Sequence, residues 1–223
     1  MTKLIIFDLD GTLIDTKKDI ADACNYALVK CGYPPRHLDE YNMLVGRGID
    51  NLFRKALPEG KADEETVKEM RGHFVPYYNE HKCDSTVPYP GIEDMLEALT
   101  AEGLRFAVAS NKYQEGTQTL VEEFFGQYPF VKILGQREGK PIKPDPLIVT
   151  EAMEGIPGIT PEEVIYCGDS DVDMQTGLNA GVRTVGVTWG FRTREELEAY
   201  SPWRLADTPK DITDIIYGER NQI

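Results

Sequence analysis

The sequence predicts an α/β protein built on a doubly wound parallel sheet, with a small helical domain inserted into it. Three features of the 223-residue chain predict this fold. Short apolar runs alternate with helical patterns, as strands and crossover helices do in a parallel sheet. One interval between two such runs is too long for a single crossover helix. A content of 41% hydrophobic and 28% charged residues also allows a sizeable buried core.

Five short apolar segments are the expected strands of the sheet. The first of them, L-I-I-F-D-L, is followed by G-T and is therefore predicted to end in a tight loop. Similar runs recur between helical patterns, which predicts a Rossmann-like core with helices on both faces. The predicted strands lie at residues 4–9, 105–109, 131–134, 164–167 and 184–187.

The interval after the first strand is predicted to be helical throughout. Asp15 or Thr16 is expected to cap a helix whose apolar residues follow i, i+3 and i+4 spacing and which stops at Gly32. A second helix is expected near residues 38–44. An apolar stripe after V-G-R-G predicts a third.

The last helix of this interval is predicted over residues 62–81, where Pro76 is expected to kink or shorten it. These helices together predict a separate cap domain, and Tyr89-Pro90-Gly91 is a plausible hinge back into the main domain. The expected division is a helical cap domain over residues 15–84 and an α/β core over residues 1–14 and 85–223.

The charge balance excludes several classes of partner. Asp and Glu number 38 against 24 Lys and Arg, so the net charge is −14. A charge of this sign repels the phosphate backbone of nucleic acids and anionic membrane surfaces. No apolar run approaches the roughly 20 residues of a membrane span, and Asp8 interrupts the run where a signal peptide would continue. We expect a cytoplasmic monomer or small homo-oligomer that binds neither nucleic acid nor membrane.

The cysteines and histidines show no metal-binding spacing. There is no C-x-x-C motif, and Cys24 and Cys31 fall seven residues apart on one face of a predicted helix. The four thiols are therefore expected to be free and buried. His37, His73 and His81 are expected to be surface or packing residues.

Two acidic clusters follow predicted strands. Asp8 and Asp10 lie two residues apart at a strand end, so both carboxylates project from the same side. In G-D-S-D-V-D, Asp169 follows the strand at 164–167 and Asp173 lies one turn into the next helix. Close carboxylates need a cation or a shared proton, and Asp8 with Asp169 would complete an oxygen site suited to Mg²⁺. The alternatives are a solvated acidic pair and a polar helix start.

Two further segments suit the binding of a phosphoryl group. V-A-S-N-K ends the second strand and brings the Ser110 hydroxyl and the backbone N–H groups after it to the same edge. K-P-D-P sets Lys143 before a rigid entry into a helix, where a fixed positive charge is useful. Lys140, which also precedes a proline, is a competing candidate. Taken singly, Ser110 also suits a helix cap, and either lysine suits a solvated surface.

The elements D-x-D-G-T, S-N-K, K-P and G-D-x-x-x-D occur in this order, each at or just past a predicted strand end. In this arrangement the sequence resembles the haloacid dehalogenase superfamily, in the branch with a helical cap between the first and second motifs. The resemblance covers nearly the whole chain and is greatest to the phosphoglycolate phosphatase branch. It implies a Mg²⁺-dependent phosphomonoester hydrolase that forms an aspartyl-phosphate, with 2-phosphoglycolate as the expected substrate.

The resemblance also implies roles for the acidic residues. Asp8 is expected to attack phosphorus and to bind Mg²⁺. Asp10 is expected to protonate the leaving oxygen, then to activate water, and to bind the metal through its backbone carbonyl. Asp169 is the other expected metal ligand. Gly168 and Asp173 are expected to support the site.

Other matching residues are expected around the phosphoryl group. Thr12 and Ser110 are expected to donate hydrogen bonds to it, and the backbone at Asn111 to hold its oxygens. Lys143 is expected to offset its charge and to position Asp8.

The V-G-R-G loop of the cap is the expected specificity element. Gly46 and Gly48 allow a close backbone approach, and Arg47 could pair with a carboxylate or second phosphate of the substrate. The alternative is a surface arginine in a turn between helices.

Several functions remain compatible with the motifs. Pyrophosphate, a nucleotide or a sugar phosphate could be the substrate, and a sugar phosphomutase would use the same aspartyl-phosphate. A receiver-like signalling module also combines acidic residues, a metal and a lysine on a doubly wound sheet, with phospho-aspartate as a switch. The long cap insertion and Asp10 argue against the receiver, which needs neither a substrate lid nor a leaving-group acid.

Overall fold

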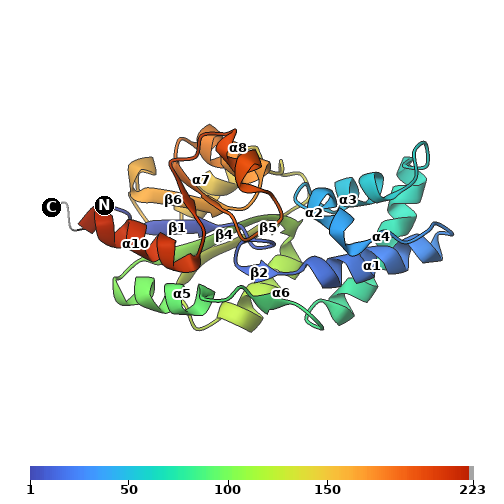
Figure 1. Ribbon diagram of the computed structural model, residues 1–223, viewed down its shortest axis with the longest axis horizontal. Helices are drawn as coiled ribbons and strands as arrows, with labels where there is room; N and C mark the ends of the chain where they lie inside the picture. The colour runs from blue at the N-terminus through green and yellow to red at the C-terminus, as the bar shows by residue number, and fades with distance from the viewer. Residues whose placement is uncertain (221–223) are drawn as a thin grey trace.

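The core of the protein is a six-stranded sheet with the strand order β5-β4-β1-β6-β7-β8, and all of its pairings are parallel. The computed structural model describes residues 1–220 (Figure 1). All five predicted strands are present, and the edge strand β8 was not predicted. The strands are β1 (Leu4–Phe7), β4 (Arg105–Tyr113), β5 (Phe130–Gln136), β6 (Val164–Gly168), β7 (Arg183–Val187) and β8 (Arg204–Ala206).

Helices cover both faces of the sheet, which confirms the doubly wound fold (Figure 1). Alternate residues of β1 point to opposite faces, so Ile5 and Phe7 pack in one core cluster while Leu4 and Ile6 pack in the other. One face carries α5 (Ile92–Ala101), α6 (Gln114–Phe125) and α10 (Pro209–Arg220), and the other carries α7 (Leu147–Met153) and α8 (Asp171–Ala180). The short elements η2 (Pro161–Glu163) and α9 (Arg194–Glu198) lie in connections.

The long interval after β1 is helical and lies beside one end of the sheet, away from the two termini (Figure 1). Its helices enclose a hydrophobic cluster of their own. Pro76 was expected to kink or shorten the last helix; it lies inside this helix, which continues to His81, so it does not shorten it, and the kink stays a prediction. The helices are α1 (Lys17–Lys30), η1 (Leu38–Glu40), α2 (Tyr41–Leu44), α3 (Ile49–Ala56) and α4 (Glu64–His81).

The two connections between the sheet and these helices pair with each other. β2 (Ile14–Asp15) and β3 (Val87–Pro88) form a two-stranded antiparallel ribbon. The buried Asp19 carboxylate accepts hydrogen bonds from the backbone N–H groups of Ser85 and Thr86, which ties α1 to the returning connection. The domain boundaries stay a prediction, and residues 221–223 of the predicted core range lie outside the described residues.

The cysteine environments differ from those expected. Cys24 and Cys167 are buried, but Cys31 is partly exposed and Cys83 is exposed, so the prediction of four buried thiols was wrong for two of them. Cys31 lies just beyond the C-terminus of α1 rather than within that helix. Within residues 1–220, no helix is both long and apolar enough to cross a membrane.

Candidate active site

The candidate active site lies at the carboxyl edge of the sheet, around the end of β1. β1 lies between β4 and β6, which the chain reaches by separate crossovers, and such a switch point opens a crevice at this edge. Asp8 follows β1, Ser110 lies in the last part of β4, and Asp169 follows β6. A pocket lies between the ends of β1 and β4 and the helical insertion. Apolar side chains of the insertion line it, among them Ile20, Val45, Ile49, Leu52 and Phe74.

Lys143 is buried in the site and holds two carboxylates together. Its Nζ lies 3.0 Å from Asp8 Oδ1 and 2.7 Å from Asp173 Oδ1. The same ammonium donates to the Ala109 carbonyl at 2.9 Å and to the Tyr166 hydroxyl at 3.0 Å. Burial lowers the pKa of Lys143, but the charges of Asp173 and Asp8 outweigh it and raise the pKa above its ordinary value. Lys143 is therefore a fixed cation.

The competing lysine, Lys140, lies elsewhere. Its side chain is 45% exposed, and its Nζ pairs with Glu151 at 3.2 Å. Of the two lysines, Lys143 is the one whose ammonium contacts Asp8.

Three buried carboxylates meet at this edge of the sheet. Asp8, Asp169 and Asp173 have oxygen atoms within 4.8 Å of one another. Burial raises the pKa of Asp8 to about 7, and burial together with the neighbouring acids raises the pKa of Asp169 well above its ordinary range. Asp173 is already neutralised by Lys143 and accepts the Tyr166 hydroxyl at 2.9 Å. Asp8 and Asp169 therefore fit a divalent cation with a preference for oxygen ligands, such as Mg²⁺.

The Asp169 carboxylate is oriented by the loop after β1 and by the loop after β7. Its Oδ1 accepts from the Thr12 hydroxyl at 3.1 Å, and its Oδ2 accepts from the Phe191 backbone N–H at 2.7 Å. Gly11 has a φ of +86°, and a Cβ there would lie 2.4 Å from Asp169 Oδ2. Any side chain at this position would therefore strain the turn and displace the carboxylate. The Trp189 indole N–H donates to the Thr12 carbonyl at 3.0 Å and supports the same turn.

Asp10 lies at the border between the core and the helical insertion. Its Oδ1 accepts from the Thr16 hydroxyl at 2.7 Å, and it pairs with Lys112 Nζ at 2.9 Å. Thr16 therefore binds Asp10 and does not use its side chain to cap α1. Lys112 also donates to the Tyr78 hydroxyl at 2.9 Å and lies 4.7 Å from the centre of the Tyr78 ring. Lys112 of β4 thus connects the side chain of Asp10 with Tyr78 of α4.

Ser110 and Asn111 have different surroundings. Ser110 is buried, and its hydroxyl accepts from the Lys112 backbone N–H at 3.2 Å. The Asn111 side-chain oxygen accepts from the Lys143 backbone N–H at 2.8 Å, while its amide donates to the Gly46 carbonyl at 3.0 Å. Asn111 therefore ties the loop of the helical insertion to the segment that carries Lys143.

The V-G-R-G loop reaches the pocket through its glycines. Gly46 and Gly48 line the pocket, whereas Arg47 is absent from the described residues that line it. The Arg47 guanidinium instead pairs with Asp171 at 2.6 Å. Arg192 lies 3.7 Å from the same carboxylate and donates to a carbonyl of this loop at 3.1 Å. Arg47 thus holds the helical insertion against the start of α8, and a substrate group would have to displace Asp171 to reach it.

Several residues at the site were not predicted from the sequence. Tyr166, Tyr78 and Arg192 come from a strand, a helix and a loop that carry no motif. The one local signal is the hydroxyl of Tyr166 inside the otherwise apolar run V-I-Y-C. Gly168 packs so tightly that a Cβ there would lie 2.3 Å from Asp173 Cβ, which agrees with a supporting position.

Comparison with known protein families shows which family the chain belongs to. The model of the haloacid dehalogenase-like hydrolase family matches residues 5–187. The match covers most of the chain, so the chain belongs to this family. The matched segment spans the acidic residues after β1 and β6, Ser110 and Lys143.

The chain is also similar over most of its length to individual proteins of this family. The chain is 34% identical over 212 residues to a phosphoglycolate phosphatase of Pseudomonas putida, with 93% of this chain and 77% of that protein covered. It is 34% identical to a phosphoglycolate phosphatase of Aquifex aeolicus, with 96% of each covered. The solved structure of a predicted phosphoglycolate phosphatase from Haemophilus somnus superimposes with a TM-score of 0.89 at 30% identity. That match covers 96% of this chain and 98% of the other.

Proposed function

We propose that the protein is a Mg²⁺-dependent phosphatase that hydrolyses 2-phosphoglycolate to glycolate and phosphate. The observation that carries the proposal is the buried Asp8 carboxylate, which contacts Lys143, lies near Asp169 and opens on a pocket beneath the helical insertion. The phosphatase class is further supported by the family match and by relatives named phosphoglycolate phosphatase.

Asp8, Asp169 and the backbone carbonyl of Asp10 would hold the metal ion. The two carboxylates supply the charged oxygen ligands that Mg²⁺ prefers, and burial raises the pKa of both, so a bound cation would stabilise their ionised forms. When bound, the ion offsets the negative charge of the phosphoryl oxygens and of the attacking carboxylate.

In the proposed first step, an oxygen of Asp8 attacks phosphorus and the bond to the leaving oxygen breaks. Oδ1 of Asp8 is held by Lys143 and by the Leu9 backbone N–H at 2.7 Å, which fixes the orientation of the carboxylate. Asp10 donates its proton to the glycolate oxygen as that oxygen leaves. In the second step, ionised Asp10 takes a proton from water, which attacks the phosphorus of the aspartyl-phosphate and restores Asp8. The net reaction consumes one water molecule.

The remaining residues bind the transferring group. Lys143 supplies a fixed positive charge next to Asp8, and the Ser110 hydroxyl and the backbone N–H groups after it lie at the same strand edge. The Thr12 hydroxyl bonds to Asp169 in this structure, so its contact with a phosphoryl oxygen requires that hydroxyl to turn. Asn111 does not contact the transferring group in this proposal; its side-chain oxygen accepts the Lys143 backbone N–H and so positions Lys143.

We assign the carboxylate of the substrate to Lys112 rather than to Arg47. Among the described residues that line the pocket, Lys112 carries the one positive charge, and its side chain is 6% exposed. Its Nζ lies 2.9 Å from Asp10 Oδ1, so the substrate carboxylate would share this ammonium with Asp10, and water screens the buried charge less than an exposed one. Arg47 lies outside the pocket and is paired with Asp171. Another small phosphate ester with an anionic group would use the same contact.

The proposal includes a cytoplasmic location, which the four free cysteines support because thiols persist in a reducing compartment. It also includes a small-molecule substrate and a monomeric or small homo-oligomeric state. A phosphomutase or a receiver-like switch would share the phosphorylated Asp8 but would not release phosphate repeatedly.

The test is phosphate release from a panel of esters with Mg²⁺ and with a chelator. The panel contains 2-phosphoglycolate, pyrophosphate, a nucleoside monophosphate and a sugar phosphate, and Asp8→Asn is the inactive control. Repeated, Mg²⁺-dependent turnover with the highest kcat/KM on 2-phosphoglycolate is expected. A higher kcat/KM on another ester would overturn the substrate assignment, and a single turnover per chain would overturn the hydrolase.

A further inference from the structure

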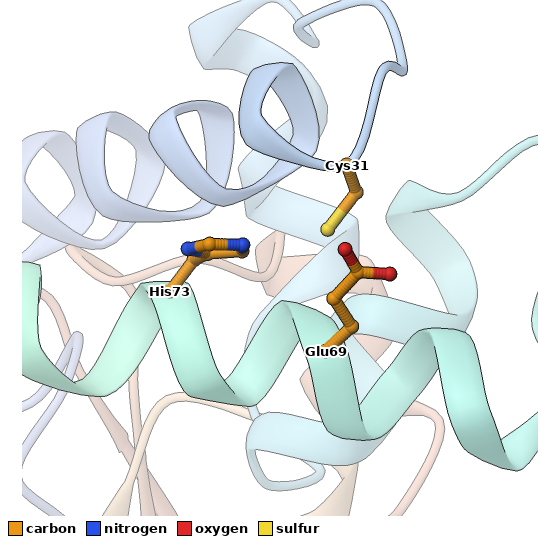
Figure 2. Close-up of side chains that lie close together, drawn as sticks. All are labelled: Cys31, Glu69 and His73. Atoms are coloured by element: carbon orange, nitrogen blue, oxygen red, sulfur yellow. The ribbon is translucent and has the colours of Figure 1, made fainter.

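A second cluster of metal-ligating side chains lies in the helical insertion. Cys31 Sγ, a carboxylate oxygen of Glu69 and a ring nitrogen of His73 all lie within 4.8 Å of one another. Figure 2 shows the three side chains converging between the end of α1 and the adjacent face of α4. His73, which was expected to be a surface or packing residue, is partly exposed and lies within ligand distance of Cys31 although the sequence shows no metal-ligand spacing.

The cluster follows from how the two helices pack. Glu69 and His73 are four residues apart on α4, so their side chains lie one turn apart on the same face. Cys31 is the first residue after α1, and α1 and α4 enclose the same hydrophobic cluster. Sequence spacing could not indicate this cluster because Cys31 approaches the other two residues only through the packing of the helices.

The chemistry of the three side chains is complementary to a cation. None of them takes part in a side-chain hydrogen bond or an ion pair with another residue in the described part of the chain. Glu69 supplies a negative charge, and the His73 ring and the Cys31 thiol, which loses its proton on metal binding, can each donate an electron pair to a cation. Sulfur, imidazole nitrogen and carboxylate oxygen together form a ligand set typical of zinc, whereas the active-site carboxylates form an all-oxygen set.

We propose that Cys31, Glu69 and His73 bind a divalent transition metal ion of the zinc class. Glu69 is exposed and the other two residues are partly exposed, so an ion can enter from solvent and keep a position open to water. The ion joins the C-terminal end of α1 to α4. Because Ile20 of α1 and Phe74 of α4 both line the pocket, this link also restrains the wall that faces the substrate. The proposal does not depend on the phosphatase function.

The test is a titration of the metal-free protein with Co²⁺ in the presence of excess Mg²⁺, which competes for the oxygen site. A thiolate ligand to Co²⁺ produces a charge-transfer absorption that carboxylate ligands do not. We expect this absorption to saturate at one Co²⁺ per chain and to disappear when Zn²⁺ is added. Cys31→Ser should abolish it, and His73→Ala should weaken Co²⁺ binding at least about tenfold, since even outer-shell partners cost that much.

Cys83→Ser is the matched control because Cys83 is exposed and lies beside the His81–Asp84 pair, the other place where a metal could meet a thiol. This variant should retain the absorption and its stoichiometry. Glu69→Gln leaves the Cys31 thiol in place and changes only an exposed side chain. It should therefore lower the affinity for Co²⁺ without affecting folding. Zn²⁺ should also raise the melting temperature of the wild type but not of Cys31→Ser. An absorption that persists in Cys31→Ser, or an equal zinc-induced shift in both proteins, overturns the proposal.

Discussion

Replacement of Lys143 by methionine tests the electrostatics of the site most directly. Methionine keeps much of the length and apolar volume of lysine but removes the ammonium that lies 3.0 Å from Asp8 and 2.7 Å from Asp173. Both carboxylates are then left buried without a cation. Loss of one partner of a buried ion pair costs about 3–5 kcal/mol, so we expect the metal-free variant to lose that much stability near neutral pH. Protonation of Asp8 reduces this loss at lower pH, because burial raises its pKa to about 7.

The catalytic effect of the same substitution should be at least about 10²-fold in kcat, as is typical for removal of one preorganised electrostatic contact. The assays are urea unfolding of the metal-free protein and steady-state phosphate release at saturating Mg²⁺. Lys140→Met is the matched control, because Lys140 is 45% exposed and its pair with Glu151 is a surface contact. The control should change stability by about 1 kcal/mol or less and leave kcat unchanged.

Two results would refute this reasoning. A Lys143→Met protein with wild-type kcat would show that the phosphoryl group does not depend on the buried ammonium. A Lys140→Met protein as impaired as Lys143→Met would show that the exposed lysine moves into the site during the reaction.

Four further predictions concern the acids and the cations around the pocket. Asp10→Asn should lower kcat on 2-phosphoglycolate by about 10²–10⁴-fold. The loss should be smaller on p-nitrophenyl phosphate, because its good leaving group needs no acid. Equal losses on the two substrates in steady-state assays would contradict the role of Asp10 as the acid. Arg47→Ala removes only a partly exposed ion pair with Asp171. It should therefore raise KM by about fivefold or less, and equally for 2-phosphoglycolate and p-nitrophenyl phosphate. Lys112→Met should instead lower kcat/KM about tenfold more for 2-phosphoglycolate than for ethyl phosphate, an alkyl ester that lacks the carboxylate. Equal losses on the two esters would show that Lys112 acts only through its pair with Asp10. Because the folded-state pKa of Asp8 is raised to about 7, its stabilising contribution is present at low pH and is lost as the pH rises through that value. Thermal melts of the metal-free protein should therefore show Asp8→Asn gaining stability relative to wild type from about pH 4 to about pH 7, and a constant difference would exclude this titration.

The fold class and the acidic residues at the strand ends could be predicted from the sequence alone. Apolar runs and helical periodicity are local properties, so the five main strands and the helical insertion after β1 could be predicted without knowledge of packing. The site could be located because the carboxyl ends of parallel strands meet at one edge of the sheet. This general rule brings Asp8 and Asp169 together although they lie far apart in the chain.

Contacts between side chains of different elements could not be predicted from the sequence, because they depend on how the elements pack. Lys140 and Lys143 have similar local sequences, and the fold alone brings the ammonium of Lys143 to Asp8. Arg47 has a partner on α8 that no spacing rule could predict, and Cys31 meets His73 through helix packing. The physical reason is that propensity and periodicity act over a few residues, whereas ion pairs and metal ligands depend on contacts that form only when distant segments pack together.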